Sequence, residues 1–320
     1  MSTALAPDRA GGLDRRTPRA VRGIYIANLV AQGAIVVTGA IVRLTESGLG
    51  CPTWPECVEG SITPTSTQVE GWTKFVEFGN RLLTFALLVL AIAAIVAALV
   101  DRRRRARAGL PARPVLVILA AIPLIGTLGQ AVLGGITVLT GLHPLTVAAH
   151  FLVSMAILAG TMALVVRSGD PGDQPVMKLV PRPVQALTWL LLAVTGAVVL
   201  LGVLVTSAGP HSGDDRAERL GIDFRTIAWL HADLVLLFLG LLIGLLVSCA
   251  LVRSPSTGAA PVLLRRRALL LLGIAALQGV IGYTQYFTGL PEVLVALHVI
   301  GAVLVWVTAL SLPAALRTRG

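Results

Sequence analysis

The sequence predicts an all-α membrane protein whose eight transmembrane helices form two related four-helix bundles. Three observations support this prediction: a high apolar content, eight long uncharged runs and an internal repeat. The chain has 320 residues, of which 55% are hydrophobic and only 13% are charged, and its mean hydropathy is +0.84. Soluble domains carry about 25% charged residues. The composition therefore excludes a soluble globular domain.

Each apolar run is long enough to cross a bilayer as a helix, because about 20 residues at 1.5 Å per residue span the hydrocarbon core. Runs of this length satisfy their own backbone hydrogen bonds in lipid, whereas barrel strands are much shorter. The first run is too long for a signal-peptide core and lacks a small-residue cleavage site, so we expect it to be retained. In order, we expect helices over residues 24–44, 75–100, 115–139, 145–166, 186–207, 225–251, 267–288 and 291–313.

The net charge of +10 is distributed in a way that predicts the topology. Twenty of the 26 Lys and Arg residues precede the first run, follow an even-numbered run or lie in the C-terminal tail. The positive-inside rule places these segments, and with them both termini, in the cytoplasm. The sequence thus predicts an integral, multi-pass protein of the cell membrane, surrounded by lipid. Because topology accounts for the basic residues, we do not expect nucleic-acid binding.

The loop after the first run, CPTWPEC, holds Cys51 and Cys57. It is predicted to face the oxidising outer side, where disulfides persist. With no neighbouring His or third Cys, cysteine arithmetic favours a disulfide between the two residues. The alternative is a pair of free thiols that bind a metal. Cys249, at the inner end of the sixth run, is interpreted as an inert core thiol.

An internal repeat organises the chain. The segments QAVLGGITVLTGLHPLTVAAH (130–150) and QGVIGYTQYFTGLPEVLVALH (278–298) align without a gap at an offset of 148 residues, with 9 of 21 positions identical. Chance similarity of apolar helices supplies matched Ala, Leu and Val, but not matched Gln, Thr-Gly and His. We infer a parallel duplication about an axis along the membrane normal. Residues 1–170 form the first half, 171–185 a cytoplasmic linker and 186–320 the second half.

Three of the five histidines lie inside predicted spans. His150, His231 and His298 each follow the outer start of an even-numbered helix by about six or seven residues, and Asn80 holds the matching place in the second helix. Polar residues at this depth are costly and favour a functional role. Two histidines at equal depth on neighbouring helices can ligate a haem iron from both faces. The alternative for each histidine alone is hydrogen bonding between helices. Zinc fits less well, because no carboxylate or Cys joins them at suitable spacing.

Glu77 lies three residues before Asn80, so both share one helix face beside the first half's porphyrin-sized space. One interpretation is a catalytic carboxylate that moves protons or stabilises positive charge. The other is a first-turn residue favoured by the helix dipole, or one paired with Lys74 or Arg81.

Four further residues are candidates for contacts to a cofactor. Arg43 and Arg81 lie off the cytoplasmic side and suit bidentate binding of haem propionates, although both could equally be snorkelling residues. His143 and His211 lie in the external turns TGLHP and SAGPHSGD. They are either turn residues or contacts to the polar edge of a cofactor.

Five segments resemble haem A synthase, in order and over residues 24–312: AIVRLTESGLGCPTWPEC, EFGNRLL, GGITVLTGLHPLTVAAH, TSAGPHSGD and GLPEVLVALH. The resemblance implies an eight-helix enzyme that oxidises a methyl group of haem O to a formyl group, giving haem A for cytochrome oxidase assembly. It also implies two partners, the enzyme that makes haem O and an electron donor that the sequence does not identify.

The resemblance further implies roles for particular residues. His231 and His298 would hold haem b in the second half, and His150 would bind the iron of the substrate haem O in the first. Glu77 matches the family's essential carboxylate, and the loop cysteines match its external pair.

The chain departs from the family at one position. The family's second-helix motif is Glu-x-x-His-Arg, whereas this chain reads EFGNR, with Asn80 in place of the histidine. We therefore expect either that His150 alone binds the substrate iron, or that Asn80 hydrogen-bonds a sixth ligand. A rival class, a dihaem b-type electron carrier that oxidises quinol, explains the histidines but not this asymmetry. A transporter built from parallel repeats would need broken helices, which are not evident.

Overall fold

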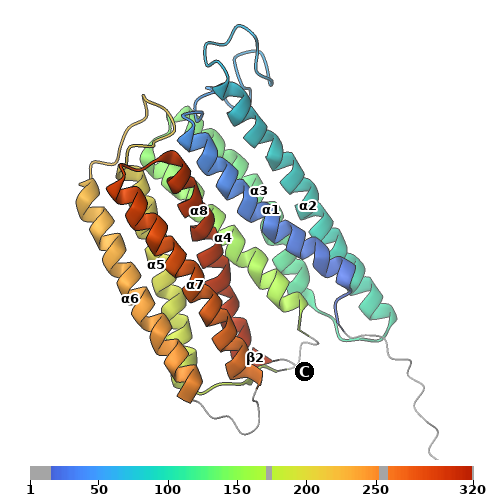
Figure 1. Cartoon of the computed structure of the whole chain (residues 1–320). Coiled ribbons are helices and arrows are strands. Elements are labelled where there is room, and N and C mark those ends of the chain that lie inside the picture. Colours follow the sequence, from blue (N-terminus) through green and yellow to red (C-terminus); the bar gives the residue numbers. More distant parts are fainter. Residues whose placement is uncertain (1–15, 171–174, 252–258, 319–320) are drawn as a thin grey trace, which may run out of the picture.

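Eight long helices run side by side in the computed structural model, which describes residues 16–170, 175–251 and 259–318 (Figure 1). All eight are long and apolar enough to cross a membrane, so the prediction of an all-α, eight-span protein is confirmed for the described residues. The helices are α1 (Arg19–Leu44), α2 (Thr73–Arg107), α3 (Pro114–Leu139), α4 (Pro144–Ser168), α5 (Arg182–Ala208), α6 (Phe224–Leu251), α7 (Ala259–Phe287) and α8 (Glu292–Ser311). A short 3-10 helix, η1 (Leu312–Leu316), follows α8.

The helices extend beyond the predicted apolar runs, most of all in α2 and α7. Helix α2 continues to Arg107, seven residues past the predicted end, and α7 begins at Ala259, eight residues before the predicted start. Apolar runs stop at the first charged residues, but Arg is a good helix former and continues the turn into the polar region. Some predicted features lie outside the described residues: Arg9, Arg15, the linker residues 171–174, Arg253 and Arg319.

Local chemistry explains where several helices begin. Helices α3, α4 and α5 carry Pro in the first turn, where its missing N–H is not needed. Helix α6 follows Asp223, whose carboxylate accepts hydrogen bonds from the amide and the hydroxyl of Thr226. These bonds also lower the pKa of the Asp223 carboxyl.

The two Thr-Gly-Leu turns of the repeat have the same backbone geometry. Gly141 and Leu142 have φ values of 62° and 59°, and Gly289 and Leu290 have values of 80° and 63°. Positive φ is easy for Gly but unusual for Leu. The paired Gly-Leu geometry therefore reverses the chain in the same way after α3 and after α7.

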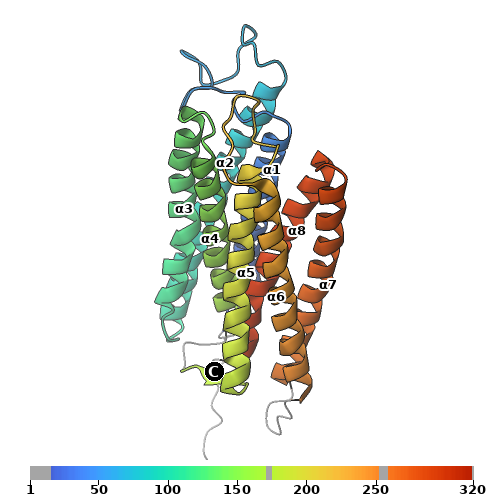
Figure 2. The same ribbon diagram turned by 90° about the vertical axis from the view of Figure 1, so that its left-hand side faces the viewer.

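Helices pack mainly within their own half of the chain. Helices α1 to α4 contact one another, as do α5 to α8, and the two groups meet through α1, α4, α5 and α8 (Figures 1 and 2). At this junction Val36, Met155, Leu158 and Val303 form a buried cluster. The indole of Trp306 on α8 donates a hydrogen bond of 2.9 Å to the carbonyl of Met155 on α4. That the halves are related by a pseudo-two-fold axis stays a prediction.

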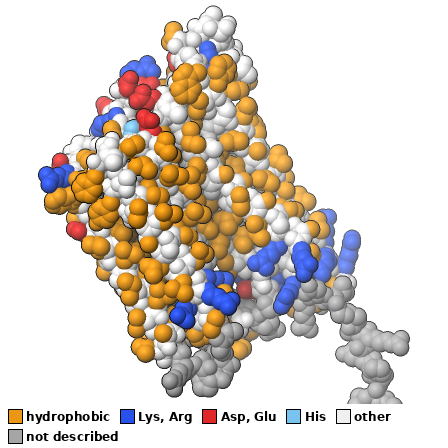
Figure 3. Space-filling view, viewed as in Figure 1, with side chains coloured by type: hydrophobic (Ala, Val, Ile, Leu, Met, Phe, Trp, Pro, Cys, Tyr) orange, Lys and Arg blue, Asp and Glu red, His pale blue; other side chains and the backbone are white. Residues whose placement is uncertain are grey.

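The bundle has two chemically different ends. Lys and Arg gather at one of them, which we call the arginine end (Figure 3). There β1 (Met177–Lys178) pairs antiparallel with β2 (Arg317–Thr318), so the connection between the halves is joined to the C-terminal segment. Because eight helices alternate in direction, the start of α1 and the end of α8 lie at this same end. The opposite end, which we call the loop end, carries the segments 45–72 and 209–223.

Helices α3 and α4 approach closely at glycine, and this gives a stability test. A Cβ at Gly126 would lie 2.6 Å from the side chain of Ile157, whereas a Cβ at Gly129 would meet nothing within 4 Å. Gly126→Ala should therefore lower the stability by about 1–3 kcal/mol through overpacking. Gly129→Ala, on the same helix, should be neutral or stabilise by up to about 1 kcal/mol through helix propensity. Thermal unfolding in detergent checks both; equal melting temperatures for the two variants would contradict the close packing.

Candidate functional site

One cavity of about 1420 Å³ extends through both halves of the bundle. It is larger than the roughly 300–1,000 Å³ of ordinary small-molecule sites. Residues of both halves line it. Seven sequence-predicted site residues are among them: Glu77, Asn80, His150, His231, His298 and the two arginines discussed below. The fold thus brings together residues that are as much as 255 positions apart in the chain.

The three half-buried histidines of the spans pack in the same way, each against a glycine of the preceding helix. A Cβ added to these glycines would lie 3.2–3.3 Å from the imidazole Cε1 atom. That distance is too short for most side chains, so the glycines let each ring lie directly on a helix backbone. The pairs are His150 with Gly134, His231 with Gly202, and His298 with Gly282.

The same contact fixes which ring nitrogen can reach a ligand. In each of the three imidazoles Nδ1 is buried and has no hydrogen-bond partner in the described part of the chain. Buried polar atoms usually have such a partner. Because Nδ1 is closed off against the neighbouring helix, Nε2 is left as the atom that can bond a ligand in the cavity. Neutral imidazole nitrogen is a common metal ligand, including for haem iron.

Asn80 occupies the fourth position but fills it differently. Its Oδ1 accepts a 2.7 Å hydrogen bond from the hydroxyl of Thr38 on α1. Residues 33–42 align with residues 196–205 at an offset of 163. This alignment matches Gly39 with Gly202, the glycine against which His231 packs. A Cβ on Gly39 would meet nothing within 4 Å. The space that an imidazole takes at the other three positions is therefore open here.

Glu77 is buried and held from two sides. Its Oε2 accepts a 2.7 Å hydrogen bond from the amide of Cys51, and its Oε1 accepts bonds of 3.0 and 2.6 Å from Nε and Nη2 of Arg81. Of the partners considered from the sequence, Arg81 is therefore the one that pairs with Glu77. Lys74 instead donates to the carbonyl of Thr65, 2.7 Å away.

The predicted disulfide between Cys51 and Cys57 is confirmed, and the alternative of two metal-binding thiols is wrong. Arg81 fastens the loop that contains it: its guanidinium donates to the carbonyls of Cys51 (2.7 Å), Thr53 (3.1 Å) and Glu56 (3.1 Å). The loop also places Trp54 on α3, where a Cβ at Gly135 would lie 2.5 Å from the indole. The disulfide loop thus covers the first half of the cavity and fixes Glu77 at its wall.

The structure distinguishes two other residues that the sequence predicts to contact a cofactor, Arg43 and His211. Arg43 lines the cavity; its Nη2 donates to the carbonyl of Thr206 in the other half, and its Nε is buried without a partner among the described residues. Arg43 therefore retains donor capacity toward a ligand. His211 does not line this cavity; its Nε2 hydrogen-bonds the carbonyl of Leu290 at 2.8 Å, beside a separate cavity of about 70 Å³.

His143 is a turn residue. Its Nδ1 accepts a 3.3 Å hydrogen bond from the amide of Leu145, which caps the start of α4. Cys249 is a buried free thiol in the core of the second half, as expected.

Sequence reasoning missed the residues that support these side chains. The glycines under His150 and His298 lie within the repeat itself and could have been found there. The match of Gly39 with Gly202 required aligning the first and fifth helices. The repeat also matches Gln130 with Gln278, but it does not indicate the role of Gln130, whose Nε2 donates to the carbonyl of His150 at 2.8 Å and to the hydroxyl of Ser154.

Fold and site together define a multi-pass membrane protein whose helices enclose a cavity lined by histidines. Residues 22–210 match the family model described as cytochrome oxidase assembly protein. This match covers more than half of the chain, and the chain belongs to that family.

Curated relatives are similar to this chain at about 30% identity. A heme A synthase of Exiguobacterium sibiricum is 29% identical over 176 residues, covering 55% of both chains. A heme A synthase of Geobacillus kaustophilus is 30% identical over 159 residues, covering 49% of this chain and 45% of the relative. A heme A synthase of Geobacillus thermodenitrificans is 31% identical over 138 residues, covering 42% of this chain and 39% of the relative. The chain spans about half the length of the curated relatives it matches.

The contacts of Arg81 give a test of how the disulfide loop is held. Both Cys51 and Cys57 are fully buried, so a reductant reaches them only when the loop opens. Arg81→Lys keeps the charge beside Glu77 but loses the guanidinium fork that binds the loop carbonyls. Because hydrogen bonds to charged groups are worth about 1.5–3 kcal/mol, we expect dithiothreitol to reduce the disulfide about tenfold faster.

Arg225→Lys is the matched control. It makes the same substitution at an arginine whose Cζ lies 4.7 Å from the centroid of the Trp229 ring, away from the disulfide loop's carbonyls. Mass spectrometry of alkylated cysteines over time measures both rates. Reduction of the Arg81→Lys variant at the rate of the control would show that Arg81 does not hold the loop.

Proposed function

We propose that this protein is a haem A synthase, which oxidises a methyl group of haem O to a formyl group and so supplies haem A for cytochrome oxidase assembly. One observation supports this function most directly. A single cavity is lined by three imidazoles that each pack against a glycine. Asn80 takes the fourth equivalent position without an imidazole, and Glu77 adds a buried carboxylate. The names of the similar curated relatives agree with it.

The residues of the second half fit a resident haem b. His231 and His298 line the same cavity, lie near enough to interact electrostatically, and keep Nδ1 against a helix backbone. They would ligate the iron from the two faces of the porphyrin. When bound, haem b would supply one-electron transfer to the reaction in the other half.

In the first half, we propose that His150 binds the iron of haem O and positions the substrate. Asn80 and Gly39 leave the opposite face without a protein imidazole. That asymmetry suits oxygen chemistry in this half, and it disfavours an electron carrier with two identical haem sites. The unpaired Nε of Arg43 is suited to a propionate of the substrate.

Glu77 would act on the charge that develops during oxidation. Its two oxygens are held by the amide of Cys51 and by Arg81, so the carboxylate does not reorient as the reaction proceeds. A fixed negative group in a site shielded from water stabilises positive charge that appears as the methyl group is oxidised.

The distribution of charge supports an orientation in the cell membrane. The positive-inside rule assigns the arginine end, with both termini, to the cytoplasm and the loop end with its disulfide to the outside. In this arrangement the protein receives haem O from the enzyme that makes it, and electrons from a separate donor.

The carboxylate gives the first test of this function. In cells that co-express the chain with a haem O source, extracted haems are expected to include haem A. Glu77→Gln should reduce haem A at least about tenfold, equivalent to about 1.4 kcal/mol of transition-state stabilisation, with haem O accumulating. Glu292→Gln, an exposed first-turn carboxylate of α8, is the control and should leave haem A unchanged. Haem A at the normal level in Glu77→Gln would remove the proposed role of Glu77, and its absence in the unmodified chain would refute the function.

Asn80 gives a second, spectroscopic test. The purified protein should bind carbon monoxide at one of its two haems, because only the first half lacks a second imidazole. Asn80→His should convert that haem to a six-coordinate, low-spin form and remove carbon monoxide binding, since the imidazole fits the open space at Gly39. His231→Asn should have the reverse effect and open the haem of the second half. Two low-spin haems in the unmodified protein, neither of them binding carbon monoxide, would contradict the assignment.

A further inference from the structure

One face of α1 is polar although it is buried inside the first half. Tyr25, Asn28 and Gln32 are three and four residues apart and so share a helix face. Tyr25 and Asn28 are fully buried, and Gln32 is 5% exposed. Polar side chains in the interior of a membrane bundle are costly and mark sites of function by default.

Two of these side chains have no partner where one is required. Both amide atoms of Asn28 and the hydroxyl of Tyr25 are buried without a hydrogen bond in the described part of the chain. Buried polar groups left unpaired by protein are typically bonded by internal water, which makes about three such bonds. The buried cluster that contains Tyr25 includes four alanines, Ala94, Ala97, Ala98 and Ala120, beside larger aliphatic residues.

The polar face connects the two functional ends of this half. At the arginine end, the carboxylate of Asp101 on α2 is 2% exposed, lies 3.5 Å from Arg104 and interacts electrostatically with Tyr25. Toward the cavity, Gln32 donates a 3.2 Å hydrogen bond to Thr127, and both residues line the cavity wall. From Tyr25 to Gln32 the chain rises about 10 Å along the helix, at 1.5 Å for each residue step.

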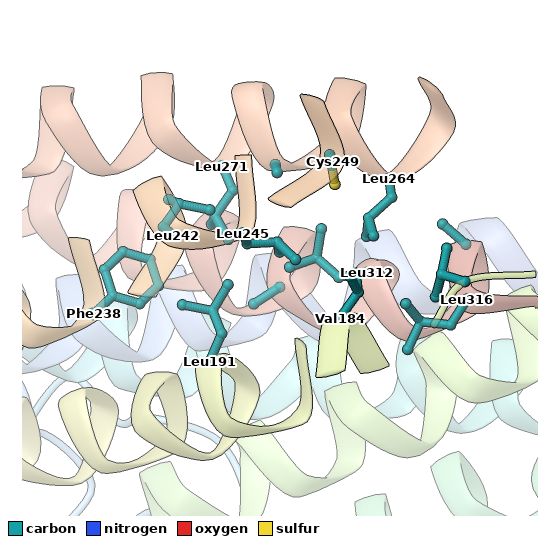
Figure 4. Packing of buried hydrophobic residues seen from close by; sticks show 14 of the residues in the cluster. Val184, Leu191, Phe238, Leu242, Leu245, Cys249, Leu264, Leu271, Leu312 and Leu316 are labelled. Carbon is teal, nitrogen blue, oxygen red and sulfur yellow. The ribbon is translucent and has the colours of Figure 1, made fainter. Parts of the chain in front are cut away.

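The second half differs from the first in the middle of this face, which makes it an internal control. At the offset of 163 residues Tyr25 and Gln32 correspond to Thr188 and Thr195, which are buried and whose hydroxyls donate to carbonyls of their own helix. At the offset of 163 residues Asn28 corresponds to Leu191, and at the offset of 148 residues Thr127 corresponds to Ala275. Both apolar residues belong to a buried cluster of the second half that is rich in leucine. Figure 4 shows Leu191 within this cluster. Two more polar residues of α4, Ser154 and Thr161, likewise correspond to alanines, Ala302 and Ala309. A structural requirement of the fold would apply to both halves, so the unpaired amide of Asn28 serves something specific to the first.

We propose that Asp101, Tyr25, Asn28 and Gln32, with water bound between them, conduct protons from the arginine end of the bundle to the cavity beside His150. The inference rests on the proposed function, which creates the demand for protons. When dioxygen oxidises a methyl group to a hydroxymethyl group, one oxygen atom enters the product. The other leaves as water, and the step consumes two electrons and two protons. The electrons come from the donor through the second half, and the polar face of α1 supplies the protons to the first.

Asn28→Leu tests the route by introducing the side chain that the second half carries. With haem O supplied, the rate of haem A formation should fall at least fivefold while the content and spectra of both haems stay unchanged. The solvent deuterium isotope effect on that rate should rise, because proton delivery becomes limiting. Thr188→Val is the matched control: Thr188 is fully buried at the position equivalent to Tyr25, does not line the cavity, and its variant should keep the normal rate.

Asn28→Ser separates conduction from packing. A hydroxyl at this position can still bind water, so most of the rate should return, whereas a merely structural role for Asn28 would leave Asn28→Ser as slow as Asn28→Leu. A normal rate and isotope effect in Asn28→Leu would overturn the proposal while the proposed function stands. Absence of haem A in the unmodified chain would refute both.

A readout without turnover is also available. An experimental density map of the unmodified protein should show ordered water bonded to the amide of Asn28. A dry site, or an Asn28 amide paired with protein, would overturn the proposal.

Discussion

The site depends on the contact between an imidazole and a helix backbone. His150, His231 and His298 each lie against a glycine of the neighbouring helix at a distance that a larger residue would not permit. This contact sets the spacing of the helices around the cavity and closes off Nδ1, which leaves Nε2 for a ligand. Small residues allow close helix approach in membranes, where lipid gives no hydrophobic driving force between helices.

The two halves use a common framework for different chemistry. The repeated turns and seated histidines are shared, but the first half replaces an imidazole by Asn80, adds a buried carboxylate and a disulfide loop, and lines α1 with polar side chains. The second half instead carries Leu191 at the position of Asn28, within a buried cluster rich in leucine. A rigid, dry interior with paired imidazoles suits electron transfer, whereas a reaction that consumes protons needs polar groups that reach solvent.

The network around Arg81 shows how the loop end is assembled. A single guanidinium bonds the carboxylate of Glu77 and three loop carbonyls, so the disulfide loop and the cavity wall form one unit. Arg43 and the amide of Gly48, which donates to the carbonyl of Gly213 at 2.9 Å, connect this unit to the other half. Within this network, the Nε of Arg43 is buried without a partner among the described residues.

The sequence alone determined the eight helices, the repeat, the disulfide and the three histidines inside the spans. These follow from hydrophobic run length, from residue identity at a fixed offset and from cysteine count, none of which needs a partner in space. Only the tertiary structure decided that Arg81 pairs with Glu77 and the loop, that His211 bonds Leu290 away from the main cavity, and that Asn28 is buried without a partner. The reason is physical: run length depends on local hydrophobicity, whereas the partner of a polar side chain depends on which helices pack together and which way their faces turn.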